Sequence, residues 1–392
     1  MMQQEKPTYT TAWIENFSQV DKDAWDALAV PLKTPFLEWE WLRLMETSGS
    51  ITAETGWQPN HLTVWSGQRL VAAAPLYIKT HSEGEFVFDY AWADLANRLG
   101  ISFYPKLVGM TPVTPVTGYR FLIASKADER YLTELMVREI DRFCIHNRIS
   151  GCSFLFVDPE WCREVAPHGF RHWVQPGYAW KNQNFTTFED YLVRFNSNQR
   201  RNIKRERKAI DNLGIRMRTY TGDEIHPDFF PLMYRFYVKT NTQFGPWSCK
   251  YLTPAFFDEL YHKYRHRILL TVASQKHNER LPVGMSLLIN KGDRLFGRYW
   301  GGFDSIRFLH FNACYYSPIE WAIVHRVSRF DPGIGGYHKI RRGFEAVPNF
   351  SLRKFYDPHL RQILQLQIDE INRLEQEQID ALNTQLPFAE NT

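Results

Sequence analysis

Apolar and polar positions follow the same order at two places about 200 residues apart. Residues 62–90 contain two short apolar runs joined by a polar loop, and then a third run from Phe86 to Tyr90. Residues 270–299 repeat this order, with a first loop three residues longer and a second loop two residues shorter. Loops between matching strands drift in length because they tolerate insertions. The pattern therefore predicts two groups of β-strands, each at the centre of one of two related domains.

Helical periodicity accounts for much of the remaining chain. Ala127 to Asn147 carries apolar residues three and four positions apart, which predicts an amphipathic helix. A polar cap at 196–198 and Gly214 bound a second, strongly basic helix. Residues 358–384 predict a last helix with one apolar stripe. We expect this helix to pack back on the body, and pairing with a second copy as a homodimer is the alternative.

Other segments are less regular. Residues 93–118 are rich in Pro, Gly and Thr, and so long an irregular stretch favours a binding loop. A final strand pair is expected over 337–356. Pro and Gly at 175–181 mark the best domain boundary. We therefore expect a first domain over 1–180, a second over 181–357 and a helical tail over 358–392.

Composition narrows the class of protein. The 392 residues are 44% apolar and 15% aromatic, which favours packed cores over disorder. The N-terminus lacks the apolar core of a signal peptide, and the run Leu70 to Ile78 is too short to cross a bilayer. The five cysteines form no C-x-x-C motif, which is typical of reduced thiols. We expect a cytoplasmic protein that is not an integral membrane protein and has no DNA partner.

The basic helix is the first candidate for chemistry. Arg200 to Lys208 holds six bases and one acid, although the net charge of the chain is only +4. Such a run is usually a solvated helix face, but it also suits the phosphates of a nucleotide or an RNA. The candidate phosphate or RNA contacts are Arg200, Arg201, Lys204 and Arg205.

A glycine-rich turn followed by bases is the second candidate. Gly333-Ile334-Gly335-Gly336 precedes Tyr337 to Phe344. Glycines let backbone N–H groups turn toward an anion. His338 is a candidate proton carrier, and bases beside it are candidates for donor or oxyanion contact. These bases are Lys339, Arg341 and Arg342.

A strand end with carboxylates is the third candidate. Asp89 and Asp94 lie among aromatic residues in Gly84 to Asp94. Either is a general base if its surroundings raise its pKa, and a turn-capping carboxylate is an equally good interpretation.

Several familiar sites are missing from the sequence. His168 and His172, like His262 and His266, are four residues apart but have no evident third metal ligand, so we expect no metal. The chain has no P-loop, no G-x-S-x-G motif and no dinucleotide fingerprint.

These segments resemble a known family. The stretches Gly84 to Asp94, Phe103 to Leu107, Thr114 to Gly118 and Phe330 to Phe344 are similar to the FemAB-like, predicted N-acyltransferase family of peptidoglycan biosynthesis or recognition proteins. The likeness runs from about residue 10 to 357, and the Fem aminoacyl transferases are more distantly similar.

The resemblance implies an α/β (α+β) fold of tandem GNAT-like domains, each with a mixed, twisted sheet flanked by helices. It implies transfer of an acyl or aminoacyl group to an amine. In the Fem relatives a lysine just before the terminal Lys/Arg-Gly-Phe contacts the acyl donor, and Arg342-Gly343-Phe344 places that role on Arg341. We expect His338 or Asp89 as the base, and Tyr104 and Lys106, with Asp94, at the acceptor.

The donor is left open at this point. An acyl-CoA thioester is the first hypothesis, although Asp304 to Phe308 replace the usual GNAT pyrophosphate loop. An aminoacyl-tRNA co-substrate is the second hypothesis, with the basic helix on RNA. A non-catalytic protein that binds an anionic metabolite or a cell-wall precursor is the third.

Overall fold

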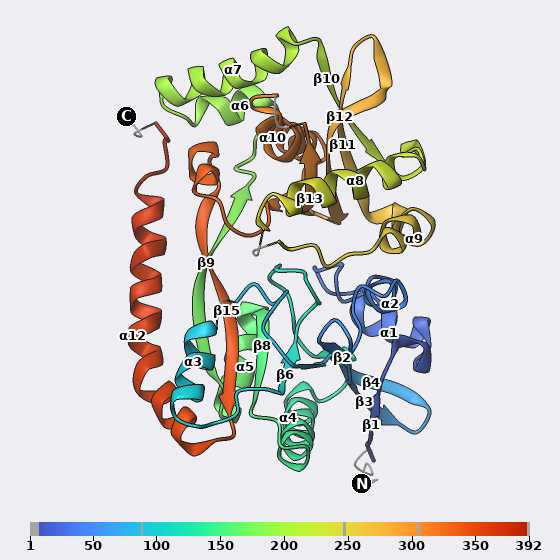
Figure 1. Cartoon of the computed structure of the whole chain (residues 1–392), viewed down its shortest axis with the longest axis vertical. Helices are drawn as coiled ribbons and strands as arrows, with labels where there is room; N and C mark the ends of the chain where they lie inside the picture. Colours follow the sequence, from blue (N-terminus) through green and yellow to red (C-terminus); the bar gives the residue numbers. More distant parts are fainter. Residues whose placement is uncertain (1–7, 88, 246–247, 304–305, 390–392) are drawn as a thin grey trace, which may run out of the picture. The chain divides into compact units, whose positions relative to one another are not determined.

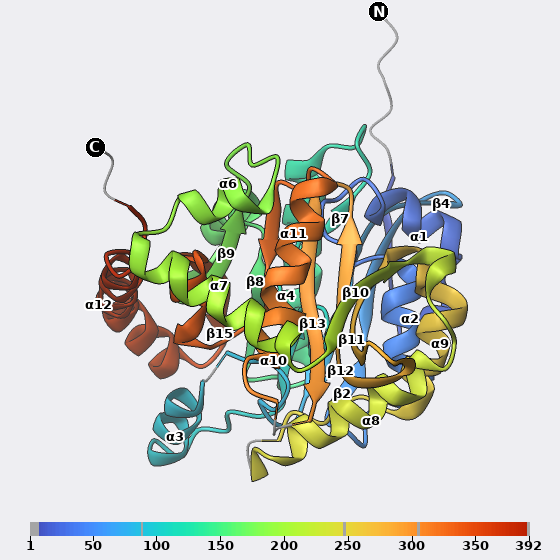
Figure 2. The same ribbon diagram turned by 90° about the horizontal axis from the view of Figure 1, so that it is seen from above.

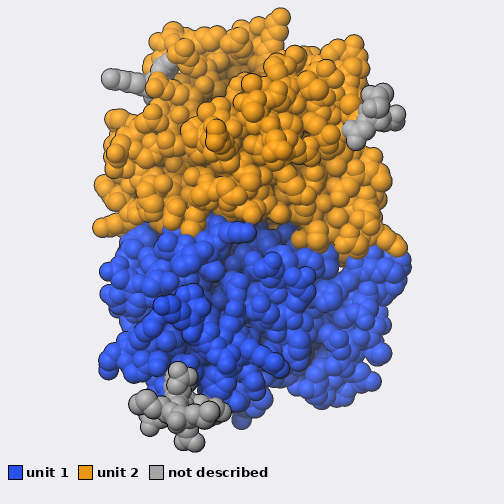
Figure 3. Space-filling view, turned by 180° about the vertical axis from the view of Figure 1, so that it is seen from behind, with its two compact units in different colours: residues 1–175, 349–374 blue, residues 176–348, 375–392 orange. Residues whose placement is uncertain are grey.

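The computed structural model describes residues 8–87, 89–245, 248–303 and 306–389 (Figure 1). It divides the chain into two compact units, coloured separately in Figure 3. Unit 1 comprises residues 1–175 and 349–374, and unit 2 comprises 176–348 and 375–392. The domains predicted from the sequence are defined by duplication, whereas these two units are defined by compactness. The predicted domain limits are therefore not tested and stay a prediction.

Unit 1 combines strands and helices from the first half of the chain. Its strands are β1 (Thr10–Ile14), β2 (Trp57–Pro59), β3 (His61–Ser66), β4 (Arg69–Ala74), β5 (Tyr77–Lys79), β6 (Lys106–Gly109), β7 (Leu122–Ile123) and β8 (Gly151–Val157). Its helices are α1 (Lys22–Ala29), α2 (Trp39–Thr47), α3 (Tyr90–Arg98), α4 (Glu129–His146) and α5 (Pro159–Val165).

Two sheets organise unit 1. One has the order β1-β3-β4-β7 with antiparallel pairs. The other has the order β8-β6-β5-β2, in which β6 and β8 are parallel. Pro75 separates β4 from β5, so that the chain leaves the first sheet and enters the second.

Unit 2 contains the second strand group. Its strands are β10 (Ile215–Thr221), β11 (Ile268–Gln275), β12 (Asn278–Lys291), β13 (Arg294–Gly302) and β14 (Arg329–Asp331). Its helices are α6 (Phe188–Val193), α7 (Ser197–Asn212), α8 (Phe229–Thr242), α9 (Pro254–Tyr264), α10 (Leu309–Phe311), a π-helix (Asn312–Tyr316), α11 (Ser317–Val324) and a 3₁₀ helix (Tyr337–Arg342). Three elements begin in one unit and end in the other: β9 (Arg171–Lys181), β15 (Glu345–Phe355) and α12 (Pro358–Asn383).

The sheet of unit 2 is antiparallel from β10 to β13 and then adds β14 parallel to β13. Helices α8 and α9 lie on one side of these strands, and α7 and α11 lie on the other (Figure 2). The apolar core between helices and sheet includes Ile203, Leu288 and Ile319. Apolar residues of α7 and α11 therefore anchor both helices.

The predicted α/β class with mixed sheets and flanking helices is confirmed. Both hairpins, β3–β4 and β11–β12, form as the repeated pattern predicts. The amphipathic helix α4, the basic helix α7 and the tail helix α12 also form. Asn196 caps α7 by accepting from the Gln199 N–H, and Gly214, with φ +67°, follows its end.

The strand predicted at Phe86 to Tyr90 is wrong. Phe86 has φ +57°, which a strand does not adopt, and α3 begins at Tyr90. Phe88 lies outside the described residues. Trp92 and Ala96, four residues apart, bury one face of α3. Aromatic residues at alternate positions are typical of a strand, but tertiary packing overrides this local preference for β-structure.

Two further predictions need correction. Residues 93–118 are only partly irregular, because they contain most of α3 and all of β6. Residues 337–342 form a 3₁₀ helix and not a strand, since Gly336 and Gly343 on either side both take positive φ. Only β15 of the predicted strand pair forms.

Helix α12 packs on the chain as the preferred interpretation predicts. Leu364, on its stripe, is 2% exposed, whereas Leu366 on the opposite side is 69% exposed. Asn372 Oδ1 accepts from the Val174 N–H at 2.8 Å. Pairing of this helix with a second copy stays an untested alternative.

We predict that Leu364→Ala lowers the free energy of unfolding by about 2–5 kcal/mol, because it leaves a cavity under α12. Leu366→Ala is the matched control and is expected to stay within about 0.5 kcal/mol of wild type. Urea unfolding of both variants measures the difference. Equal losses would contradict the burial of this stripe.

Candidate functional site

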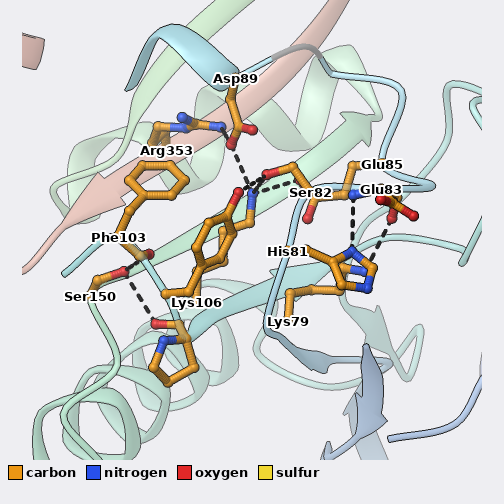
Figure 4. Close-up of polar contacts among 12 residues, drawn as sticks. Lys79, His81, Ser82, Glu83, Glu85, Asp89, Phe103, Lys106, Ser150 and Arg353 are labelled. Carbon is orange, nitrogen blue, oxygen red and sulfur yellow. Dashed lines mark hydrogen bonds and ion pairs between the residues drawn. The ribbon is translucent and has the colours of Figure 1, made fainter. Parts of the chain in front are cut away.

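Lys106 on β6 is the centre of a buried charged cluster in unit 1 (Figure 4). Its ammonium donates to Ser82 Oγ at 2.7 Å, Glu85 Oε2 at 2.7 Å and Asp89 Oδ2 at 2.8 Å. These three bonds use all three ammonium donors. Lys106 is therefore a structural cation and not a free ligand contact.

Asp89 is held from two sides. Its Oδ2 also accepts from Arg353 Nη2, on β15, at 2.7 Å. Burial by itself would raise the Asp89 pKa, but the charges of Arg353 and Lys106 outweigh it and lower the pKa to about 2. A carboxylate with so low a pKa is a poor general base, so the geometry favours an electrostatic role for Asp89.

Burial changes two other groups of this cluster. It raises the pKa of Glu85 against the opposing charge of Lys106. It lowers the pKa of Lys79 to about 7. The Lys79 ammonium lies 3.6 Å from the centroid of the Trp57 ring and donates to the Glu83 carbonyl at 3.1 Å. Lys79 is thus an amine that exists in both its charged and its neutral form near neutral pH.

Tyr104 is the partly exposed member of the cluster. Its hydroxyl is 2.8 Å from Ser82 Oγ, which links it to Lys106. Asp94 does not join this group, because it is exposed on α3 and pairs with Arg98 at 2.7 Å. The structure therefore brings Asp89, Tyr104 and Lys106 together and leaves Asp94 apart.

In unit 2, the glycine-rich turn leads into the 3₁₀ helix that carries His338. His338 is half-buried, and its Nε2 is 2.8 Å from the hydroxyl of Tyr315 in the π-helix. Gly336 has φ +91°, and a Cβ there would lie 2.5 Å from the His338 ring. Glycine at this position leaves room for the imidazole.

The environment keeps His338 uncharged. Burial, and then the charges of Lys339 and Arg342, lower the His338 pKa to about 4. A second imidazole, His310, packs edge-on at 5.5 Å between ring centroids, and burial lowers its pKa to about 3. Both rings are neutral at physiological pH, so His338 has a lone pair for a proton.

Lys339 holds the glycine-rich turn from inside. Its buried ammonium donates to the carbonyls of Gly333 at 2.7 Å and Ile334 at 3.1 Å. Asp331 Oδ1 accepts from the Gly333 N–H at 2.9 Å. Burial lowers the Lys339 pKa to about 8 despite the charge of Asp331. Lys339 thus shapes the turn and is not exposed to a ligand.

Arg342 is also buried, whereas Arg341 is exposed. Arg342 Nη2 contacts both carboxylate oxygens of Glu206, on α7, at 3.0 and 2.8 Å. Its guanidinium carbon lies 3.3 Å from the centroid of the Phe311 ring. Of the three predicted donor contacts, only Arg341 faces solvent.

Helix α7 divides its charges between two faces. Arg201, Lys204 and Arg205 are exposed, and Lys204 makes only a surface pair with Glu189 at 3.1 Å. Arg200 is half-buried, and its Nη2 donates to the Phe195 carbonyl at 3.1 Å. Three of the four predicted phosphate contacts are therefore available on the surface.

Sequence reasoning missed several residues of these clusters: Arg353, Glu85, Ser82, His310, Tyr315 and Glu206. One signal was available for His310. It follows β13 by eight positions and His338 follows β14 by seven, and these strands are parallel neighbours. Parallel strands end at the same edge of a sheet, which brings such residues together.

Among the described residues, no group of three or more His, Cys, Asp or Glu side chains is arranged to hold a metal ion. Likewise, no helix in the described ranges has the length and apolar character needed to cross a membrane. Met1 to Pro7, and Asp304 and Ser305 of the segment that replaces the GNAT pyrophosphate loop, lie outside these ranges.

The family model described as peptidoglycan biosynthesis/recognition, FemAB-like, matches residues 16–390. The chain belongs to the FemAB-like family. This confirms the resemblance stated above. No curated protein matches the chain in sequence.

Solved structures similar to this FemAB-like chain share little sequence with it. FemX is 10% identical, with 91% of this chain and 99% of that chain covered and a TM-score of 0.53. The C-terminal domain of a putative lysylphosphatidylglycerol synthetase from Agrobacterium fabrum is 8% identical, with 91% and 97% covered and a TM-score of 0.52. These likenesses show the fold.

A tandem GNAT protein from the clavulanic acid biosynthesis pathway is 11% identical, with 89% of this chain and 99% of that chain covered. Its TM-score of 0.40 is too low to support an argument. FemAB-like membership, together with the α/β fold, supports an acyl or aminoacyl transferase as the class of enzyme.

We predict a pH-dependent stability that depends on Lys79. Its pKa is about 7 when folded and 10.5 ordinarily, so the unfolded chain holds the extra proton between these values. Stability should therefore rise with pH in this window, by at most about 1.4 kcal/mol per pH unit. Urea unfolding from pH 7 to 10 should show a smaller rise in Lys79→Met than in wild type, because Lys339, with a pKa of about 8, still contributes in the variant. Exposed Lys33→Met is the control, and an equal rise in both lysine variants would contradict the assignment.

Proposed function

We propose that the protein is an N-acyltransferase that moves an acyl group from an activated donor, a thioester of the acyl-CoA type, to an amine. Family membership supports the transferase class, and the chemistry of unit 2 supports the reaction. The observation that carries the proposal is the half-buried, neutral His338 hydrogen-bonded to Tyr315.

His338 has the properties of a general base. In the tautomer that serves this role, Nε2–H donates to the Tyr315 oxygen and Nδ1 keeps its lone pair. The amine nitrogen attacks the donor carbonyl and forms the C–N bond, while Nδ1 takes the amine proton. The C–S bond then breaks, and His338 returns the proton to the leaving thiolate.

The glycine-rich turn suits the negative charge that develops on the carbonyl oxygen. Backbone N–H groups from Ile334 to Gly336 are the proposed donors, because the Gly333 N–H already donates to Asp331 and glycines with positive φ let neighbouring N–H groups turn toward an anion. Lys339 and Arg342 add positive potential from behind the turn. Arg341, which is exposed, is the proposed direct contact with the donor.

Unit 1 offers a polar group for the acceptor. Tyr104 is partly exposed, and its hydroxyl is fixed by Ser82 and, through it, by Lys106. We therefore assign Tyr104 to acceptor binding and Lys106 and Asp89 to its support. His338 is preferred to Asp89 as the base because it is half-buried, whereas Asp89 is fully buried and its Oδ2 already accepts from Lys106 and Arg353.

We predict that His338→Ala lowers kcat by about 10²–10⁴-fold, the usual loss when a general base is removed. Turnover is measured with a panel of acyl-CoA thioesters and amines, using free thiol release and mass spectrometry of the product. Exposed His325→Ala should keep wild-type turnover. Unchanged activity in His338→Ala would remove His338 from the mechanism, and turnover with any donor would exclude a non-catalytic binding protein.

A second candidate is an aminoacyl-tRNA-dependent transferase. It is favoured by the exposed cationic face of α7. Arg201, Lys204 and Arg205 share this face because the second and third lie three and four positions after the first. An array of this kind binds phosphates through long-range attraction and bidentate contacts. The donor would then be an ester, and the proposed role of His338 would be the same.

For this candidate, the triple variant Arg201→Ala, Lys204→Ala, Arg205→Ala should lose most tRNA affinity. The slope of log K against log salt should fall by about two to three, close to one for each phosphate contact removed. Filter binding at several salt concentrations measures both quantities. Lys33→Ala combined with Lys126→Ala is the control for surface charge. Binding of acyl-CoA without any binding of tRNA would exclude this candidate.

A further inference from the structure

The basic run of α7 contains a single acid, Glu206, and it faces inward. Glu206 is 8% exposed, although its neighbours on both sides are bases. Both of its carboxylate oxygens accept from Arg342 Nη2, and Oε2 also accepts from the Tyr316 hydroxyl. A buried carboxylate with this many charge-assisted bonds has its position determined by them.

Other residues on the same face of α7 hold the same segment. Gln199 is 5% exposed, and its Nε2 donates to the Arg341 carbonyl at 2.6 Å. Ile203 and Ile210 are buried on this face at helical spacing from Gln199 and Glu206. Helix α7 therefore binds the 3₁₀ helix at two points, which are the backbone of Arg341 and the guanidinium of Arg342.

Arg342 in turn contacts His338. Its Nη1 donates to the His338 carbonyl at 2.9 Å, and its own carbonyl accepts from the Tyr191 hydroxyl at 2.8 Å. A second link passes through the π-helix, where the adjacent Tyr315 and Tyr316 bind His338 and Glu206 respectively. Glu206 is thus connected through Arg342 to the backbone of His338. It is also connected through Tyr316 to Tyr315, which is the hydrogen-bond partner of the His338 side chain.

We propose that Glu206 is a positioning residue for His338 in acyl transfer. It acts through Arg342 and Tyr316 and does not touch substrate. The inference rests on the proposed function, since it needs His338 as the base. A base displaced by about 1 Å loses roughly 100-fold in rate, so the network is expected to act on kcat and not on substrate binding.

The test compares Glu206→Gln with Glu320→Gln. Glu320 also pairs with an arginine of α7, Arg207 at 2.7 Å, but that pair is only partly buried. We expect Glu206→Gln to lower kcat by about 10–100-fold with KM changed less than about threefold. Glu320→Gln should keep wild-type kinetics. Tyr316→Phe, which keeps the ion pair, is a milder second variant with an expected loss in kcat of about 3–10-fold.

A double variant separates positioning from general destabilisation. If Glu206 acts through His338, then Glu206→Gln should cost nothing further in a His338→Ala background. The inference is overturned if Glu206→Gln has wild-type kcat, if KM rises while kcat is kept, or if the two losses multiply. Full activity of His338→Ala alone would instead overturn the proposed function, so the two failures are distinguishable. If Glu206→Gln does not fold, Tyr316→Phe alone and in the His338→Ala background decides.

Discussion

Charges that leave water must be paired, and this constraint organises both candidate clusters. An unpaired buried ion costs several kcal/mol, so each buried cation fixes the segments that supply its partners. In unit 1, Lys106 joins β6 to the loop before α3 through Glu85 and Asp89. In unit 2, Arg342 joins the 3₁₀ helix to α7 through Glu206. The ion pairs therefore set the positions of the polar groups proposed for chemistry.

The same burial divides the chemical roles. Close cations lower the pKa of Asp89 to about 2, which keeps it charged and weakens it as a base. Burial and neighbouring cations also lower the pKa of His338 to about 4, which keeps it neutral with a free lone pair. In the proposed mechanism the buried Asp89 carboxylate is an electrostatic support and the half-buried His338 imidazole is the proton acceptor.

Helix α7 presents two chemically different faces. Its outer face carries exposed bases, and its inner face carries Gln199, Ile203 and Glu206. Composition reports only the excess of bases, so the sequence left open whether this helix is a solvated face or a surface contact with phosphate. The structure adds that the same helix supports the segment with His338. The single acid in the basic run was the available signal for this supporting role. An acidic side chain that faces the interior needs a buried cation as its partner.

Local patterns determined the hairpins β3–β4 and β11–β12, the amphipathic helix α4, the capped helix α7 and the stripe of α12. Caps, turns and periodicity act over a few residues, so these elements could be read from the sequence. Only the tertiary structure decided that residues 337–342 are helical and that Asp89 precedes a helix. It also decided the partners of the charges, since Asp89 and Arg353 are 264 positions apart and Glu206 and Arg342 are 136 apart. Pairing over such separations depends on how the sheets bring the strands together, which no local pattern encodes.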